Sequence, residues 1–329
     1  MLVLIIFFGI FTLLLGIIVH ELGHLVFGLV SGYSFSVFRV GPLCWFKEEG
    51  RMRFRVSKSP VVGQCLMTPN PIFENFKFVL YNAGGGIFNV LFALVFVPIL
   101  FFELNTFVLI WVVNSFVLGV LNLVPSGRAI PNDGRNIIKA LESKAAARGL
   151  YNMLYSNGRF VQGATYSDFD ENFFDMPEEA NVNNYLVATS VLSKAGQLDW
   201  LGRYDEAARE FERLPKEVLD KLPTFYKVGA KLALIDFYVM RKKDFQAAID
   251  LAQDAYVKKV LKASSSYNPS YLCVSAGYAF FVEKDRERAL KLLDGVDFKS
   301  LPKGVGVMAE REVAGLVREL NRNKNSIQI

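Results

Sequence analysis

Residues 2–30 read LVLIIFFGIFTLLLGIIVHELGHLVFGLV, and this stretch decides the fold class. An apolar run of about 20 residues is long enough to cross a bilayer as a helix. Its one charged side chain, Glu21, lies between His20 and His24. No Lys or Arg precedes the run, and no small-residue cleavage site follows it. We therefore expect a membrane helix that is retained and not removed as a signal peptide.

The two histidines of the chain both belong to this run. His20 and His24 are four residues apart, so on a helix their rings share one face and can hold one metal ion. Together with Glu21 they form the His-Glu-x-x-His pattern, in which the histidines bind zinc and the glutamate is the general base. A zinc-hydrolase motif inside an apolar run indicates peptide-bond cleavage within a membrane.

Two further charge-free stretches predict two more membrane helices, at about residues 78–102 and 106–124. The connection between them, near Glu103, is very short, so they should form an antiparallel hairpin. Seven Lys and Arg residues lie between positions 39 and 77 and five between 128 and 148, whereas the N-terminus and the Glu103 turn have none. The positive-inside rule then places the N-terminus outside and the C-terminal region in the cytoplasm of a cell that we expect to be bacterial. His20 lies about 28 Å along the first helix, near the cytoplasmic side of the membrane.

Residues 33–67, between the first two spans, have a different pattern. Apolar and polar side chains alternate loosely from Phe35 to Val40 and again from Arg51 to Val56, with turn residues between them. This pattern predicts one or two β-hairpins at the cytoplasmic surface, and an irregular loop is the alternative. An open strand edge beside a protease site could hold an extended substrate by strand addition.

Two histidines do not complete a catalytic zinc site, which usually has three protein ligands and one water. The chain has no further histidine, and its three cysteines are too dispersed for a disulfide framework or a cysteine zinc site. A carboxylate is therefore expected as the third ligand. Glu103 lies at the wrong depth, whereas Asp133 follows the third span on the same side as His20. Pro and Gly residues from 125 to 134 break the helix there, so that Asp133 can turn towards the metal.

These residues resemble the site-2 protease family of intramembrane zinc metalloproteases over about residues 10–140. The zinc motif is His20–His24, and Ala83–Asn89 fits the family's Gly-x-x-x-Asn signature with Gly85 and Asn89 as its ends. Asn122–Pro125 followed by Asn132–Gly134 is similar to its Asn-Leu-Pro and Leu-Asp-Gly segment, although Asn132 replaces the usual leucine. The resemblance implies that His20, His24 and Asp133 bind Zn2+ and that Glu21 is the catalytic base. It also implies substrates that are transmembrane segments or remnant signal peptides.

Several amides and glycines in the second and third spans allow two interpretations. Asn82, Asn89, Asn114 and Asn122 could bridge helices, as amides in membrane helices often do. Asn89 and Asn122, together with Gly85, could instead contact the substrate backbone or assist the oxyanion. The run Gly84–Gly86 most simply lets two helices approach closely.

The C-terminal half carries a degenerate repeat. Ala207, Ala248 and Ala289 recur at intervals of 41 residues, each within a similar amphipathic pattern. The pattern resembles helical hairpins of the tetratricopeptide type, and such repeats usually offer a concave protein-binding surface. The alternative is a small helical domain that only stabilises or tethers the protease. We expect a protease core at 1–140, a linker or helix at 141–180 and a cytoplasmic helical-repeat domain at 181–329.

The fold class expected is therefore a multi-pass α-helical membrane protein with a three-helix protease core, a small β-hairpin insertion and a cytoplasmic all-α domain. The function expected is an intramembrane zinc endopeptidase. The alternative is a membrane-anchored interaction scaffold with an inactive protease core, although a dead core would not need the four site residues. The chain is 52% hydrophobic with a net charge of +5, and its basic residues form no aromatic-interleaved patch. This distribution excludes nucleic acid as a partner and leaves the bilayer, a membrane peptide substrate and a possible protein partner at the repeats.

Overall fold

The computed structural model describes residues 2–57, 61–263, 268–298 and 301–322. Lys58, which contributes to the predicted topology, and the last residues of the predicted repeat domain, 323–329, lie outside the described residues. The chain divides into two compact units, Met1–Val161 and Gln162–Ile329.

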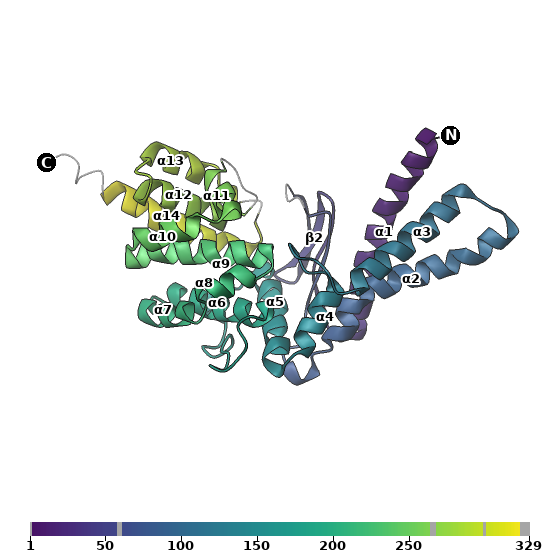
Figure 1. Ribbon diagram of the computed structural model, residues 1–329, viewed down its shortest axis with the longest axis horizontal. Coiled ribbons are helices and arrows are strands. Elements are labelled where there is room, and N and C mark those ends of the chain that lie inside the picture. The colour runs from purple at the N-terminus through teal and green to yellow at the C-terminus, as the bar shows by residue number, and fades with distance from the viewer. Residues whose placement is uncertain (1, 58–60, 264–267, 299–300, 323–329) are drawn as a thin grey trace. The chain divides into compact units, whose positions relative to one another are not determined.

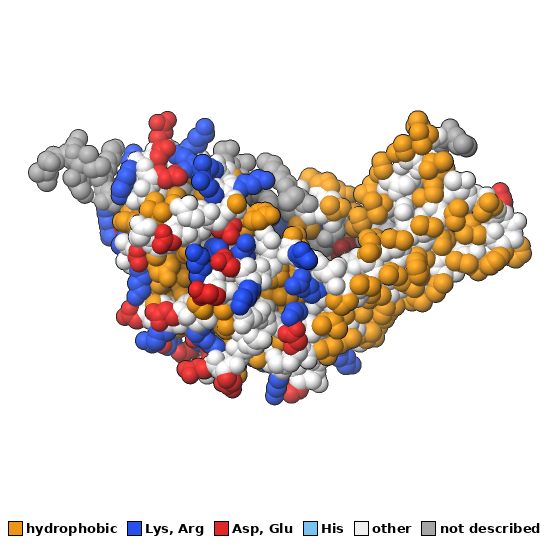
Figure 2. Space-filling model, viewed as in Figure 1, with side chains coloured by type: hydrophobic (Ala, Val, Ile, Leu, Met, Phe, Trp, Pro, Cys, Tyr) orange, Lys and Arg blue, Asp and Glu red, His pale blue; other side chains and the backbone are white. Residues whose placement is uncertain are grey.

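Three long apolar helices form the core of the first unit (Figure 1). They are α1 (Leu2–Val30), α2 (Phe78–Phe102) and α3 (Thr106–Leu123), and each is long and apolar enough to cross a membrane. Their bounds agree with the three predicted spans. Asn105 begins α3 by accepting hydrogen bonds from the backbone N–H groups of Phe107 and Val108. Figure 2 shows that apolar side chains cover most of the visible face of these helices, which is what a lipid-facing surface requires.

Glycines let the three helices cross with their backbones almost in contact. A Cβ atom added to Gly84 on α2 would lie 2.9 Å from the carbonyl oxygen of Gly23 on α1. A Cβ atom added to Gly119 on α3 would lie 2.7 Å from the carbonyl oxygen of Gly86 on α2. The expectation that the glycine run allows close helix approach is therefore confirmed. Gly84 faces α1, and Gly86 faces α3.

The chain segment that connects α1 to α2 forms a four-stranded antiparallel sheet. Its strands are β1 (Ser34–Val40), β2 (Leu43–Glu48), β3 (Arg51–Val56) and β4 (Gly63–Thr68), in the order β3-β2-β1-β4. Phe38 on β1 pairs with Trp45 on β2 and with Cys65 on β4, which fixes the register. The predicted hairpins are confirmed and the irregular loop is excluded. A single-turn helix, η1 (Phe73–Asn75), leads from the sheet into α2.

Two amphipathic helices follow α3 and complete the first unit. These are α4 (Asp133–Leu141) and α5 (Lys144–Val161). Val161 at the end of α5 packs against the buried sheet residues Val37, Cys44 and Phe46. The Tyr151 hydroxyl of α5 donates to the carbonyl oxygen of Pro71, 2.8 Å away. The first part of the segment 141–180 is therefore a helix, α5, that packs against the sheet.

The second unit is made of short helices that pack in pairs. The longer, first members of the pairs are α6 (Tyr185–Trp200), α9 (Thr224–Phe237) and α12 (Pro269–Phe281). The second members are α7 (Tyr204–Glu212), α10 (Phe245–Ala252) and α13 (Arg286–Asp294). The remaining elements are η2 (Tyr166–Asp168), α8 (Lys216–Lys221), the short π-helix η3 (Tyr238–Lys242), α11 (Ala255–Lys262) and α14 (Lys303–Arg322).

The 41-residue spacing of the sequence recurs in the geometry of these pairs. Ala207, Ala248 and Ala289 are each 0% exposed, at the same place in α7, α10 and α13. The turn before each of these helices contains a left-handed residue, and these residues are Gly202 (φ +80°), Lys243 (φ 55°) and Lys284 (φ 62°). The short helices α8 and α11 lengthen the connection between pairs, which accounts for a period longer than the usual 34 or so residues. The resemblance to the tetratricopeptide family stays a prediction.

Candidate metal centre

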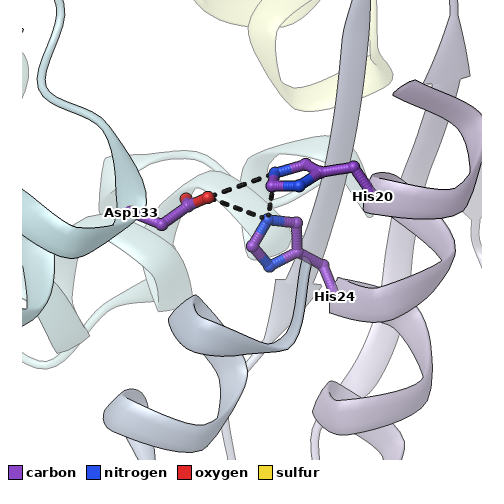
Figure 3. Close-up of side chains that lie close together, drawn as sticks. All are labelled: His20, His24 and Asp133. Carbon is purple, nitrogen blue, oxygen red and sulfur yellow. Dashed lines mark hydrogen bonds and ion pairs between the residues drawn. The ribbon is translucent and has the colours of Figure 1, made fainter. Parts of the chain in front are cut away.

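Three ligand atoms from two distant parts of the first unit meet at one point. His20 and His24 project from one face of α1, and Asp133 is the first residue of α4, as Figure 3 shows. The Nε2 atoms of the two histidines are 3.1 Å apart. Oδ2 of Asp133 lies 3.2 Å from Nε2 of His20 and 3.3 Å from Nε2 of His24. The three atoms therefore form a nearly equilateral triangle.

This triangle fits a zinc ion. Tetrahedral zinc with bonds of 2.0–2.1 Å separates its ligand atoms by about 3.3 Å, which is close to the spacing of the three atoms. Charge supports the same ion, because Asp133 and Glu21 bring two carboxylates to the two imidazoles, and a dication would neutralise the two carboxylates. The donor set of two imidazoles and one carboxylate is that of many catalytic zinc sites, which keep a fourth position open.

His24 is held in the orientation that metal binding requires. Its Nδ1 donates to the carbonyl oxygen of Tyr81 on α2, 2.9 Å away. A proton on Nδ1 leaves the lone pair of a neutral imidazole on Nε2, the atom that faces His20 and Asp133. Tyr81 is fixed in turn, because its hydroxyl donates to the carbonyl oxygen of Cys65 on β4 at 2.7 Å.

Gly85 makes room for both rings one turn after Tyr81. A Cβ atom at this position would lie 2.6 Å from Cε1 of His20 and 2.6 Å from Nε2 of His24. Tyr81, Gly85 and Asn89 are spaced four residues apart, so they share the face of α2 that meets the metal ligands. This face of α2 therefore presents three features to the two imidazoles: the carbonyl oxygen of Tyr81, the space beside Gly85 and the amide of Asn89.

Asn132 places Asp133. Its Oδ1 accepts from the backbone N–H of Arg135 at 3.0 Å and so caps α4. The same amide reaches across to the end of α3, where Nδ2 donates to the carbonyl oxygens of Leu121 and Val124, both at 2.7 Å. Gly134 lies so close to the carbonyl oxygen of Leu123 that no side chain fits. Asn132 thus has a structural role, because it joins α4 to the end of α3.

Glu21 lies beside the ligands without joining them. The ligand group consists of His20, His24 and Asp133, and Glu21 is 7% exposed. Its carboxylate accepts a hydrogen bond from the backbone N–H of Cys65 on β4. A Cβ atom on Gly63 would lie 2.6 Å from Oε1 of Glu21, so this edge of the sheet approaches the carboxylate closely.

The four asparagines of the second and third spans have different partners. Asn114 on α3 donates to Thr12 Oγ1 at 2.8 Å and to the carbonyl oxygen of Gly9 at 3.2 Å, both on α1, so it bridges helices. Asn82 and Asn122 donate to carbonyl oxygens four residues earlier in their own helices. Asn89 is 0% exposed, and its amide nitrogen lies 3.5 Å from Nδ1 of His20. Substrate contact by Asn89, Asn122 and Gly85 stays a prediction.

Sequence reasoning missed two residues of this site, Tyr81 and Asn132. The spacing of Tyr81, Gly85 and Asn89 could have identified Tyr81, because positions i, i+4 and i+8 share a helix face. The cap at Asn132 is a standard helix signal, but its contacts with α3 have no sequence signature.

Comparison with known families supports the first part of this site. Residues 8–107 match peptidase family M50. The similarity to the site-2 protease family is therefore confirmed over that range, and it suggests an intramembrane metalloprotease. The matched segment ends before Asp133, so the third ligand depends on the geometry described above. No curated protein and no solved structure gives a match.

Proposed function

We propose that the chain is an intramembrane zinc endopeptidase that cleaves peptide bonds of transmembrane segments or of signal-peptide remnants. The observation that carries the proposal is the convergence of Nε2 of His20, Nε2 of His24 and Oδ2 of Asp133 within 3.1–3.3 Å of one another. The match to peptidase family M50 over residues 8–107 supports it.

His20, His24 and Asp133 would hold the zinc ion. When bound, the ion supplies a Lewis acid that polarises a peptide carbonyl and acidifies a water molecule. Glu21 would move a proton from the attacking water to the leaving amine, because it is the buried carboxylate next to His20, His24 and Asp133 that does not belong to the ligand group. The hydrogen bond from the backbone N–H of Cys65 keeps the Glu21 carboxylate oriented for this role.

The proposed setting is a membrane that α1, α2 and α3 cross, with the N-terminus outside and the second unit in the cytoplasm. The basic residues between α1 and α2 and after α3 support this orientation. The site then lies within the membrane near its cytoplasmic side. The exposed apolar side chains of the three helices would face lipid.

The open edge of β4 is the proposed place for the substrate backbone. β4 is the last strand in the sheet order, and within the described residues it pairs with β1 alone. At Cys65 the outward backbone groups already bond to Glu21 and Tyr81. A peptide could therefore pair near Gly63, where β4 lies close to the Glu21 carboxylate. The helical repeats of the second unit are the proposed contact for a protein partner.

The deciding experiment is Glu21→Gln in the full chain, purified in detergent and returned to liposomes with a model transmembrane substrate. The variant should keep stoichiometric zinc and lose cleavage by about 10²–10⁴-fold, the usual contribution of a general base. Glu103→Gln, in the turn between α2 and α3, is the matched control and should cleave normally. Cleavage by Glu21→Gln at the normal rate would show that the assigned mechanism is wrong. A wild-type chain without zinc or activity would instead favour the inactive scaffold.

A further inference from the structure

The two metal-binding imidazoles need the same protonation pattern but have different neighbours at Nδ1. Each presents Nε2 to the ligand triangle, so each neutral ring must carry its proton on Nδ1. His24 meets this need by donating to the carbonyl oxygen of Tyr81. An equivalent acceptor is required at Nδ1 of His20, because a proton there would otherwise be buried without a partner.

Asn89 is the group that faces Nδ1 of His20. Its side-chain nitrogen lies 3.5 Å from that atom, and its Oδ1 is buried with no hydrogen-bond partner among the described residues. The two ends of a side-chain amide have nearly the same shape, so a half-turn of the amide exchanges them without steric cost. After this rotation Oδ1 faces Nδ1 of His20 and gains the partner that it lacks.

We infer that Asn89 is a positioning residue for zinc binding, whose amide oxygen accepts the proton of His20 Nδ1 and so presents Nε2 to the metal. This inference rests on the zinc site of the proposed function. It assigns His20 the same arrangement that Tyr81 gives His24, with both supporting groups on one face of α2, eight residues apart.

The surroundings of Asn89 leave its side chain few other directions. Its backbone carbonyl accepts from Ser115 Oγ on α3 at 2.9 Å, which fixes α2 at this position. A Cβ atom added to Gly119 on α3 would lie 3.1 Å from the Cβ of Asn89, so α3 closes that side. Asn89 is 0% exposed and is therefore enclosed between α1 and α3.

Asn82 provides a matched comparison on the same helix. It is buried, at 4% exposure, and its amide nitrogen donates to the carbonyl oxygen of Phe78 in its own helix at 2.8 Å. Replacing either asparagine by leucine removes a buried amide from α2, but only the change at position 89 removes a group that faces a metal ligand.

The test measures zinc affinity in the detergent-solubilised full chain by competition with a chromophoric chelator. Asn89→Leu should bind zinc about 10–100-fold more weakly than the wild type, the usual effect of losing such a supporting group. Asn82→Leu should stay within a few-fold of the wild type. Asn89→Asp keeps an acceptor oxygen and should retain most of the affinity, which guards against a leucine variant that merely misfolds.

Two results would overturn the inference. One is a folded Asn89→Leu variant with wild-type zinc affinity, and a raised KM in such a variant would make Asn89 a substrate contact. The other is an Asn89→Asp variant that loses zinc as completely as the leucine variant. Both results concern variants of a wild-type chain that binds zinc, whereas failure of the proposed function would appear as a wild-type chain that binds none.

Discussion

In the first unit the helices contact each other at glycine residues, whereas in the second unit they contact each other at alanine residues. Gly23 and Gly84 bring α1 against α2, and Gly86 and Gly119 bring α2 against α3, so that backbone meets backbone. In the second unit Ala207, Ala248 and Ala289 occupy equivalent places, each fully buried.

The difference is the one expected if, as proposed, lipid surrounds the helices of the first unit and water surrounds the second unit. Helices exposed to lipid gain little from hiding apolar side chains, so their association depends on close packing of backbones, which glycine permits. Helices in water gain from removing apolar surface, so each buried methyl group contributes. The same need for small residues is therefore met by different amino acids, and the proposed membrane setting of the first unit accounts for its glycines.

The largest expected effect is at Gly85, which faces the imidazole rings and not a helix backbone. In Gly85→Ala the new methyl would lie 2.6 Å from Nε2 of His24, so the two rings must move apart. We expect zinc binding to fall by more than about 100-fold, because both ligands on α1 lose their geometry. Metal analysis after dialysis measures the loss.

Gly9→Ala is the control for that variant. Gly9 lies in α1, and a Cβ atom there would meet nothing within 4 Å. The Gly9→Ala variant should therefore bind zinc as the wild type does. Equal zinc binding by both variants would contradict the fit of Gly85 to the rings.

The next effect distinguishes the two kinds of helix crossing. In Gly84→Ala the methyl would lie 2.7 Å from Cβ of Phe27 and 2.9 Å from the carbonyl oxygen of Gly23, so α1 and α2 must separate, at a cost of about 1–3 kcal/mol. Ala248→Gly, at the corresponding kind of crossing in the second unit, should cost about 1 kcal/mol through lost helix propensity and burial. Titration of the detergent-solubilised variants with SDS measures and compares their free energies of unfolding. A Gly84→Ala variant that is more stable than the wild type would refute the backbone-contact argument.

Charge inside the second unit gives a smaller, pH-dependent effect. Burial, with Asp199 nearby, raises the pKa of Asp236 to about 6, while Arg241 and Lys243 oppose the rise. The folded chain then holds this proton more tightly than the unfolded chain, so stability falls as pH rises between about 4 and 6. Asp236→Asn should remove that slope and stabilise the unit by about 1–2 kcal/mol at pH 7.5.

Hydrogen exchange of α9 in the solubilised full chain measures this stability at each pH. The exposed carboxylate of Asp205, which pairs with Lys242 at 3.4 Å, provides the control. Asp205→Asn should leave the pH profile unchanged. An Asp236→Asn variant with the wild-type profile would show that Asp236 titrates normally.

The smallest effect concerns the turns that separate the helices of each pair. Gly202 has φ +80° and open space around it, so Gly202→Ala adds backbone strain and no clash. It should cost about 1 kcal/mol. Gly315→Ala in α14, which also meets nothing within 4 Å, should instead stabilise by up to about 1 kcal/mol. Thermal unfolding shows whether each variant has a higher or a lower stability than the wild type. A Gly202→Ala variant that is more stable than the wild type would contradict the proposed backbone strain.

Much of the first unit could be predicted because its signals are long or chemically rare. Charge-free runs set the three helices to within a few residues, since a charge in the lipid is costly. The histidine pair of the candidate metal site could be located because the two histidines of the chain lie on one helix face. Alternation of side chains indicated the strands of residues 33–67, but not that β4 would pair with β1, because pairing order depends on contacts between distant residues.

The rest depends on contacts that leave little trace in the sequence. Tyr81 acts on His24 through its backbone carbonyl, so its side chain carries no hint of that role. The short helices α8 and α11 have too few residues for a clear period. The repeat itself could be detected because Ala207, Ala248 and Ala289 must all be small.

The amide of Asn132 has one further consequence. It ties the start of α4 to two carbonyl oxygens at the end of α3 and to the Ser126 hydroxyl just after it, so Asp133 is already restrained in the direction of the histidines. A ligand restrained in this way has little conformational entropy left to lose when an ion arrives. If a chelator removes the proposed zinc ion, the protein should therefore stay folded and able to bind zinc again. Small zinc domains, in contrast, unfold when their ion is removed.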